Sequence, residues 1–112
     1  MSIVAAVLLA APAGAAAHHG WSGYDASQVL TLTGTIQEAG YEHPHGFVRL
    51  ATADKSWTVV LAPPSRMESR GLPRENLAAG TTATIVGYPH RSVGGEVRAE
   101  RITIAGKTTE LR

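Results

Sequence analysis

The sequence contains no cysteine among its 112 residues. Disulfides, thiolate metal ligands and cysteine redox chemistry are therefore excluded, and any metal site has to use histidine, carboxylate, methionine or backbone groups. A strong charge of one sign is also lacking, because ten Lys and Arg nearly balance nine Asp and Glu, for a net charge of +1. Binding to nucleic acid needs clustered cations, so we expect no nucleic-acid partner.

The sequence also lacks an apolar run that could comfortably cross a bilayer, which takes about 20 residues. Residues 3–17 are almost entirely Ala, Val, Leu and Ile, interrupted by Pro12 and Gly14. A short apolar segment that ends in small residues, here Ala15 and Ala17, is typical of a secretory signal peptide. A buried N-terminal helix is the alternative, and the proline and glycine oppose it.

The expected organisation follows from cleavage after Ala17, although Ala13 and Ala15 offer a second cut. We expect a signal peptide over residues 1–17, an arm over 18–28 and one small domain over 29–112, which is too short for two cores. The protein would then be periplasmic or secreted, with no membrane segment after cleavage. No Lys or Arg precedes the apolar run, which suggests a truncated or misassigned start.

Five segments of the domain alternate between apolar and polar residues, or are rich in β-branched residues, as half-buried strands are. Gly34 interrupts the first of them and predicts a bulge or a sharp bend. A short helix is expected after Pro63, because Ser65 and Glu68 have capping-box spacing and Gly71 suits a left-handed closing residue. The expected strands cover residues 29–41, 47–52, 56–62, 82–87 and 97–105.

Three strands, a short helix and two strands make the order of an OB-fold, so we predict an all-β, five-stranded OB-fold-like barrel (β-β-β-α-β-β). A five-stranded meander sandwich with a helical insert is the alternative. In an OB-fold, ligands meet the face between the first–second and fourth–fifth strand loops. These loops would be residues 41–46 and 88–95.

The candidate binding residues lie in these loops and in the arm. His43 and His45 are two apart, so on an extended segment fixed by Pro44 they would face one side; two solvated histidines are the alternative. His90 is a supplementary candidate that is more often a surface residue. The aromatic candidates are Trp21, which would pin the arm or shield a metal, Tyr41 and Tyr88.

Cleavage after Ala17 would leave His18 as the first residue, with its amine beside its imidazole. The two nitrogens form a chelate, and His19 or His45 could supply a third nitrogen. Copper(II) prefers such planar nitrogen sites, and zinc or nickel are possible alternatives. Cleavage one residue earlier would place a histidine third from the amine, an arrangement that binds copper(II) or nickel(II) through backbone amides without a folded partner. A disordered terminus without a ligand is the remaining alternative.

Five short motifs follow one another along the chain, namely Ala17-His18-His19-Gly20-Trp21, Thr31-Leu32-Thr33-Gly34-Thr35, Pro44-His45, Pro64-Ser65 and Val86-Gly87-Tyr88-Pro89. Their order resembles a family of small exported proteobacterial proteins classed as a domain of unknown function. The resemblance implies export and carries over His18, His19 and His45, whereas the position of His43 is more usually Asn. A looser similarity, to small-barrel periplasmic copper chaperones, rests on fold and compartment.

These observations predict an exported protein that binds copper(II) through nitrogen, for carriage, buffering or delivery to a periplasmic partner protein. The expected ligands are His18, His19 and His45, with His43 and His90 as supplements. A rival from another class is a non-metal module that binds a peptide, glycan or protein with the barrel face around Tyr41 and Tyr88. An oxidative copper enzyme is a third option, disfavoured because so small a domain offers little surface to position a substrate.

Overall fold

The computed structural model describes residues 20–112. The expected signal peptide and the two candidate ligands His18 and His19 lie outside the described residues. Within the described part, no helix is both long and apolar enough to span a membrane.

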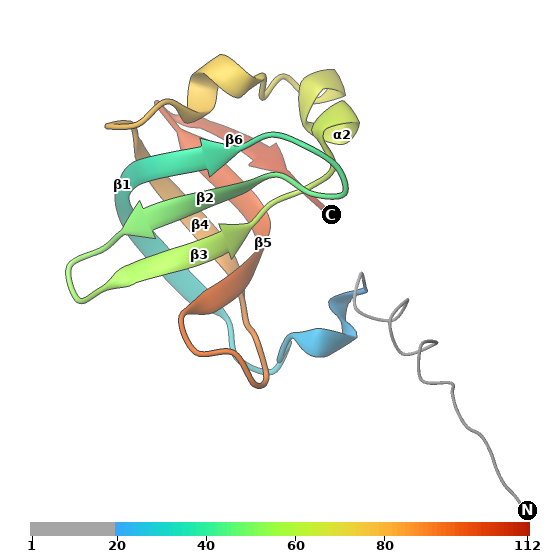
Figure 1. Cartoon of the computed structure of the whole chain (residues 1–112), viewed down its shortest axis with the longest axis vertical. Coiled ribbons are helices and arrows are strands. Elements are labelled where there is room, and N and C mark those ends of the chain that lie inside the picture. The colour runs from blue at the N-terminus through green and yellow to red at the C-terminus, as the bar shows by residue number, and fades with distance from the viewer. Residues whose placement is uncertain (1–19) are drawn as a thin grey trace, which may run out of the picture.

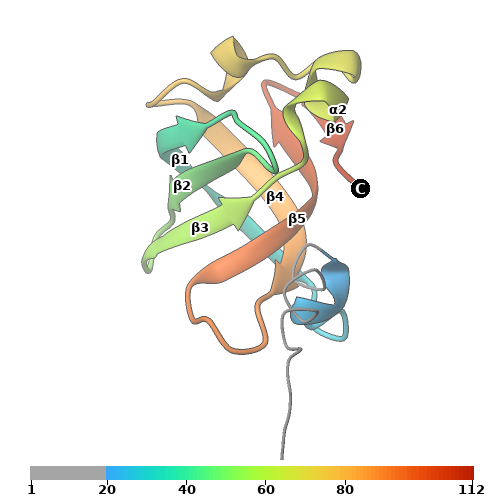
Figure 2. The same ribbon diagram turned by 45° about the vertical axis from the view of Figure 1, so that its right-hand side comes forward.

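Five strands form the predicted barrel (Figure 1). They are β1 (Leu30–Gly40), β2 (Phe47–Ala51), β3 (Ser56–Val60), β4 (Thr82–Pro89) and β5 (Glu96–Ile104). The antiparallel order is β3-β2-β1-β4-β5, and a parallel pairing of β3 with β5 closes the sheet on itself, which is plain where these two strands run together in Figure 2. The OB-fold-like prediction is confirmed.

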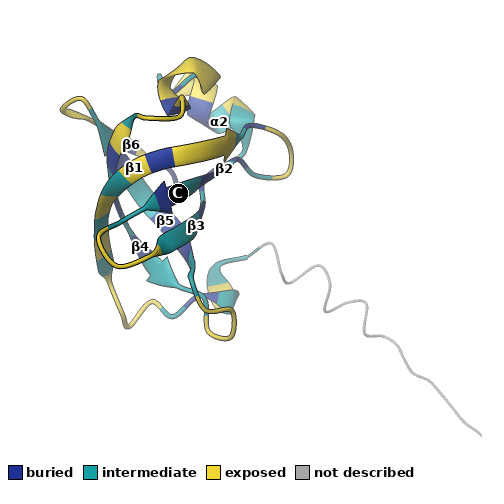
Figure 3. Ribbon diagram, turned by 60° about the vertical axis from the view of Figure 1, so that its left-hand side comes forward, coloured by how far each residue is buried: buried dark blue, intermediate teal, exposed yellow. Residues whose placement is uncertain are grey.

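Alternation along the strands explains the core. In β4 the buried positions are Ala83, Ile85 and Gly87, and the intervening residues are less buried. Only Ile36 is fully buried in β1, which Figure 3 shows as a largely exposed strand. Side chains that alternate across a strand give one face to the core and one to the surface. The alternation in the sequence therefore indicates correctly which side chains line the barrel interior.

Gly34 lies at a close approach between strands. A Cβ at this position would lie 2.2 Å from the carbonyl oxygen of Ala51 in β2, so no larger residue fits without a backbone shift. The irregularity in the pairing of β1 with β2 lies instead between Ile36 and Glu38. The bulge predicted at Gly34 is therefore displaced along the same strand, and the glycine is needed for the contact with Ala51.

The helical connection between β3 and β4 closes one end of the barrel. It consists of α2 (Pro64–Ser69) and a 3₁₀ turn, η3 (Arg74–Leu77), which bury Met67 and Leu77. Gly71 has the predicted left-handed conformation, with φ of +86°. The predicted capping box is wrong, because Pro63 is the N-cap and no side chain caps the helix.

A sixth strand, β6 (Lys107–Glu110), pairs with β5 outside the barrel and was not predicted. After it, Leu111 enters the core with only 1 % of its surface exposed. The strand is polar and four residues long, so it carries no hydrophobic alternation of the kind that identifies strands in sequence. The fourth predicted strand was also too short, since β4 extends through Tyr88 and Pro89.

Candidate functional site

At the barrel seam, where β3 pairs with β5, one row of residues runs across four strands. Phe47 of β2 pairs with Val60 of β3, and Val60 pairs with Arg98 of β5. Arg98 in turn pairs with Tyr88 of β4. His45 lies two residues before Phe47, in the connection between β1 and β2. Residues far apart in the sequence are therefore neighbours on the outside of the seam.

The N-terminal arm, residues 20–28, is attached to the end of β4 by backbone hydrogen bonds. The amide of Asp25 donates to the carbonyl of Pro89 at 2.9 Å, and the amide of Arg91 donates to the carbonyl of Gly23 at 2.9 Å. Tyr24 forms an isolated antiparallel bridge with His90. These bonds fix the register of the arm against the barrel.

Tyr24 also locks the arm through its side chain. The residue is 7 % exposed, and its ring meets the His90 ring edge-on at a centroid distance of 5.0 Å. Its hydroxyl donates to Oε2 of Glu96 at 2.5 Å. Burial first, and then the neighbouring Glu96 carboxylate, raise the pKa of Tyr24, so the hydroxyl stays protonated and continues to donate.

Trp21, in the short 3₁₀ turn η2 (Trp21–Gly23), lies between two guanidinium groups. The Cζ atom of Arg98 is 4.4 Å from the centre of its ring, and that of Arg112 is 4.5 Å away. The ring also meets Tyr88 edge-on at 6.0 Å. Cations at these distances are attracted to the negative face of an indole. Trp21 therefore pins the arm to the barrel, which is one of the two roles predicted for it.

The arm runs in a definite direction across this surface. Tyr24 lies against His90, and three residues earlier Trp21 lies against Arg98. Nη2 of Arg98 is 3.5 Å from Nε2 of His45. Since one C–N bond joins these two contacts, the Trp21 ring centre lies at most about 9 Å from Nε2 of His45. The arm thus contacts His90 through Tyr24, and through Trp21 it contacts the arginine that lies beside His45.

Arg98 is the most unusual charged group of the site. Alternation places Val97 and Ala99 in the core and Arg98 on the outer face of β5, yet Arg98 is only 4 % exposed. Burial lowers its pKa, and so do the nearby charges of Arg66 and Arg112, opposed by Tyr24. Among the described residues no carboxylate lies within ion-pairing distance of it, and its Nε has no hydrogen-bond partner.

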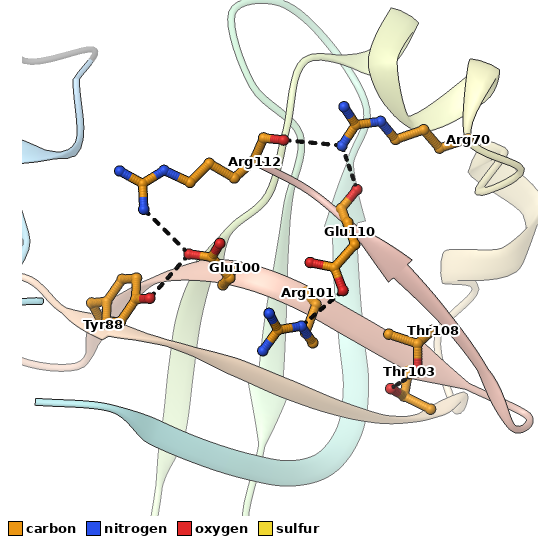
Figure 4. A network of polar contacts seen from close by, with 8 residues as sticks. All are labelled: Arg70, Tyr88, Glu100, Arg101, Thr103, Thr108, Glu110 and Arg112. Atoms are coloured by element: carbon orange, nitrogen blue, oxygen red, sulfur yellow. Dashed lines mark hydrogen bonds and ion pairs between the residues drawn. The ribbon is translucent and has the colours of Figure 1, made fainter.

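The neighbouring cations, in contrast, are paired (Figure 4). Arg112 lies 3.5 Å from Oε1 of Glu100, which also accepts a hydrogen bond from the hydroxyl of Tyr88 at 3.0 Å. Arg101 pairs with Glu110 at 2.9 Å. The network holds the C-terminal residues against β5. Its two carboxylates, Glu100 and Glu110, pair with Arg112 and Arg101 and form no ion pair with Arg98.

The three described histidines occupy different environments. His45 is half-buried beside Arg98, whereas His43 is exposed. Nδ1 of His90 accepts from the backbone amides of Ser92 and Val93 at 3.1 and 3.0 Å, which organises its own loop. The loops carrying His45 and His90 lie at different ends of the barrel, the first beside α2 and the second beside the arm (Figure 1). The structure therefore does not bring all three together.

The two loop tyrosines are built into the fold. Tyr41 is 7 % exposed, its hydroxyl donates to the carbonyl of Leu72, and Arg74 lies 5.5 Å from its ring centre. Burial raises its pKa. Tyr88 contacts Trp21 and Glu100, as described above, and the hydrogen bond to that carboxylate raises its pKa. Both tyrosines already have partners for their hydroxyls.

Within residues 20–112, no group of three or more His, Asp or Glu side chains is arranged to hold a metal ion. The other two ligands that the sequence predicts beside His45, namely His18 and His19, lie outside the described residues. Sequence reasoning missed Arg98 entirely, because an arginine between two apolar residues of a strand is an ordinary surface residue. Only the docked arm shows that it is buried.

Comparison with known proteins gives a fold and a family. No curated protein matches the chain. The crystal structures of TiaS in complex with tRNA and ATP, and of a ZRD-deleted TiaS mutant with agmatine, are similar to it, each with a TM-score of 0.54 and 21 % identity. The matches cover 80 % and 79 % of this chain but only 20 % and 25 % of those proteins, and they show the fold alone. Residues 6–98 match the Family of unknown function (DUF6152), and the chain belongs to that family.

Proposed function

We propose that this protein is exported and binds copper(II), or a similar divalent ion such as zinc or nickel, through His18, His19 and His45. It would carry or buffer the ion, or pass it to a periplasmic partner protein, rather than turn over a substrate. The supporting observation is the docked arm, whose Trp21 lies against Arg98, the neighbour of His45.

The reach of the arm is sufficient for this site. His18 lies three positions before Trp21, and an extended chain covers roughly 10 Å over three residues. Because the Trp21 ring lies within about 9 Å of His45, the amine and ring of His18 can approach the imidazole of His45. The amine and two or three imidazole nitrogens would form the planar nitrogen set that copper(II) prefers.

The contact between His45 and Arg98 is compatible with a metal-ligating imidazole. A guanidinium can only donate hydrogen bonds, so a hydrogen bond across this contact requires Nε2 of His45 as the acceptor. A neutral imidazole is the form that ligates metals. Binding of an ion at Nε2 would replace the long 3.5 Å contact to Arg98.

The test is a copper(II) titration of the chain that begins at His18, after mass spectrometry has established the N-terminus of the exported protein. We expect His18→Ala and His45→Ala each to weaken binding at least tenfold. His43→Ala is the matched control for His45→Ala, because it removes an exposed histidine from the same loop. Retaining residues 1–17 removes the amine of His18 and is expected to weaken binding as well.

Equal affinity in the wild type, His18→Ala and His45→Ala would refute the proposed site. If the exported protein instead begins at Ala17, binding that depends on His19 but not on His45 would show a site confined to the N-terminal peptide. The rival function, a peptide, glycan or protein module around Tyr41 and Tyr88, has less support, because both side chains are already engaged in the fold.

A further inference from the structure

A buried cation without a counter-ion is costly, because burial removes its hydration and nothing replaces it. Arg98 is in this position: it is 4 % exposed, and the carboxylates of the described residues are paired elsewhere or too far away to form an ion pair with it. Apart from Tyr24, the groups whose electrostatic interaction shifts the pKa of Arg98 are the cations Arg66 and Arg112, and both lower it. The surroundings of Arg98 therefore favour an anion.

One edge of the Arg98 guanidinium, formed by Nε and Nη2, is poorly satisfied. Nε has no hydrogen-bond partner among the described residues, and Nη2 has the long contact to His45. Nε–H and Nη2–H point in the same direction as a two-pronged fork, which matches the two oxygens of a carboxylate. The same guanidinium lies over the Trp21 ring, with its Cζ atom 4.4 Å from the ring centre.

The fork opens beside the side chain that we propose as a metal ligand. The other proposed ligands, an amine and imidazoles, are all neutral, so a divalent ion at His45 would add two positive charges next to Arg98. An anion between them would reduce this repulsion and provide an oxygen ligand. Copper(II) accepts oxygen as well as nitrogen in its tetragonal sites.

We propose that the Nε/Nη2 edge of Arg98 binds a small carboxylate or bicarbonate anion, which completes the coordination of the metal held at His45. The co-ligand role rests on the proposed function. Nε is buried in the structure, so the anion reaches this edge only after a local rearrangement of the neighbouring side chains. The site would then take up metal and anion together.

The anion site can be tested without copper. In proton–nitrogen NMR spectra, the Nε–H resonance of Arg98 is followed while sodium acetate, and separately bicarbonate, is added in a sulfonate buffer, with and without zinc. We expect a saturable shift for Arg98 that is larger with zinc, and no comparable shift for Arg101, which lies on the same strand and has Glu110 as its partner. A linear, unsaturated response at both arginines would show that water satisfies Nε, and it would overturn the proposal.

The co-ligand role is tested by copper(II) titration of the chain that begins at His18, in the same buffer with and without about 10 mM acetate or bicarbonate, which is enough to occupy a millimolar site. We expect the anion to raise copper affinity by up to about tenfold, because the gain is limited to one plus the ratio of the anion concentration to its Kd, which is about ten for a millimolar site at this concentration. Arg98→Met should abolish this effect, because methionine has no hydrogen-bond donors. Its apolar side chain can still pack against Trp21, so the arm should stay docked. Arg98→Lys, which keeps the charge without the fork, should retain only a small part, and Arg101→Met should leave the effect intact.

The outcomes separate this inference from the proposed function. Copper binding that does not depend on the anion in the wild type refutes the co-ligand role and leaves the histidine site standing. If no copper binds under any condition, the proposed function fails, and so does the co-ligand role, while the NMR titration still decides whether Arg98 binds an anion. An effect of the anion that persists in Arg98→Met places the anion elsewhere and overturns the assignment to Arg98.

Discussion

Removal of the Trp21 ring tests how firmly the arm is attached to the barrel. In Trp21→Ala, two guanidinium contacts, at 4.4 and 4.5 Å, and the edge-on contact to Tyr88 are lost. Each cation–π contact contributes about 0.5–1 kcal/mol at exposed sites, and an aromatic pair about 0.5–1.5 kcal/mol. We take about 2 kcal/mol for the arm, because the indole is only half-buried.

Hydrogen exchange measures this quantity directly. The amides of Asp25 and Arg91 are bonded across the junction between arm and barrel, so they exchange when the arm detaches. A loss of about 2 kcal/mol lowers their protection roughly 30-fold. The amide of Gly46, which donates to the carbonyl of Ala62 inside the barrel, is the control and should keep its protection.

Two results would contradict this reasoning. Unchanged protection at Asp25 and Arg91 would mean that the backbone bonds and Tyr24 hold the arm without the indole. An equal loss at Gly46 would mean that the substitution destabilises the whole barrel, and that the arm is not a separate unit of stability.

Three further predictions concern the fold and the pH dependence of the arm. Gly34→Ala should destabilise the protein by about 1–3 kcal/mol or more in chemical denaturation, because its Cβ would meet the backbone of Ala51. The control is Gly94→Ala, which has open space around the glycine and should stay within about 1 kcal/mol of the wild type. Leu111→Ala should cost about 2–5 kcal/mol in the same assay, because it removes a buried side chain from the core; a value near zero would show that the C-terminal segment is not part of the cooperative unit. Hydrogen bonds from Ser27 and Gln28 lower the pKa of Asp25 from 3.8 to about 2. A carboxylate with a depressed pKa stabilises the folded state at pH values above its unfolded pKa, so protection of the arm amides should fall as the pH drops from about 4 through 2. Asp25→Asn should remove that dependence.

The strands and the helix were predictable because their signals are local. Alternation identified the five barrel strands, and the positions of Pro63 and Gly71 identified the helical connection. The order of elements then led to the correct barrel, since few arrangements close five strands around one short helix. The sixth strand was missed for the same reason, because Lys107–Glu110 has no apolar face and pairs only because the chain turns back on β5.

The site was harder to predict because it depends on contacts between distant residues. The histidines were visible in the sequence as residue types, but the separation of His45 from His90 depends on which ends of the barrel their loops occupy. Arg98 became a candidate only through the pairing of β3 with β5 and the docking of the arm. Neither contact leaves a periodic signal in the sequence, so burial of this arginine could not be derived from its neighbours.

Docking of the arm and binding of a metal at His45 must strengthen each other if both occur. An ion that bridges His18 and His45 binds only the docked arm, so its binding energy adds to the stability of docking, and the two equilibria are coupled by the same factor in both directions. If the arm is docked most of the time, Trp21→Ala lowers the fraction of molecules with a docked arm only modestly. Copper affinity then falls in proportion to that fraction. The same copper should then restore the protection of the Asp25 and Arg91 amides in Trp21→Ala. A chelate formed by the N-terminal peptide alone would bind copper equally well in the wild type and in Trp21→Ala, and it would leave those amides unprotected. The coupling therefore distinguishes a site that includes His45 from a site confined to the N-terminal peptide.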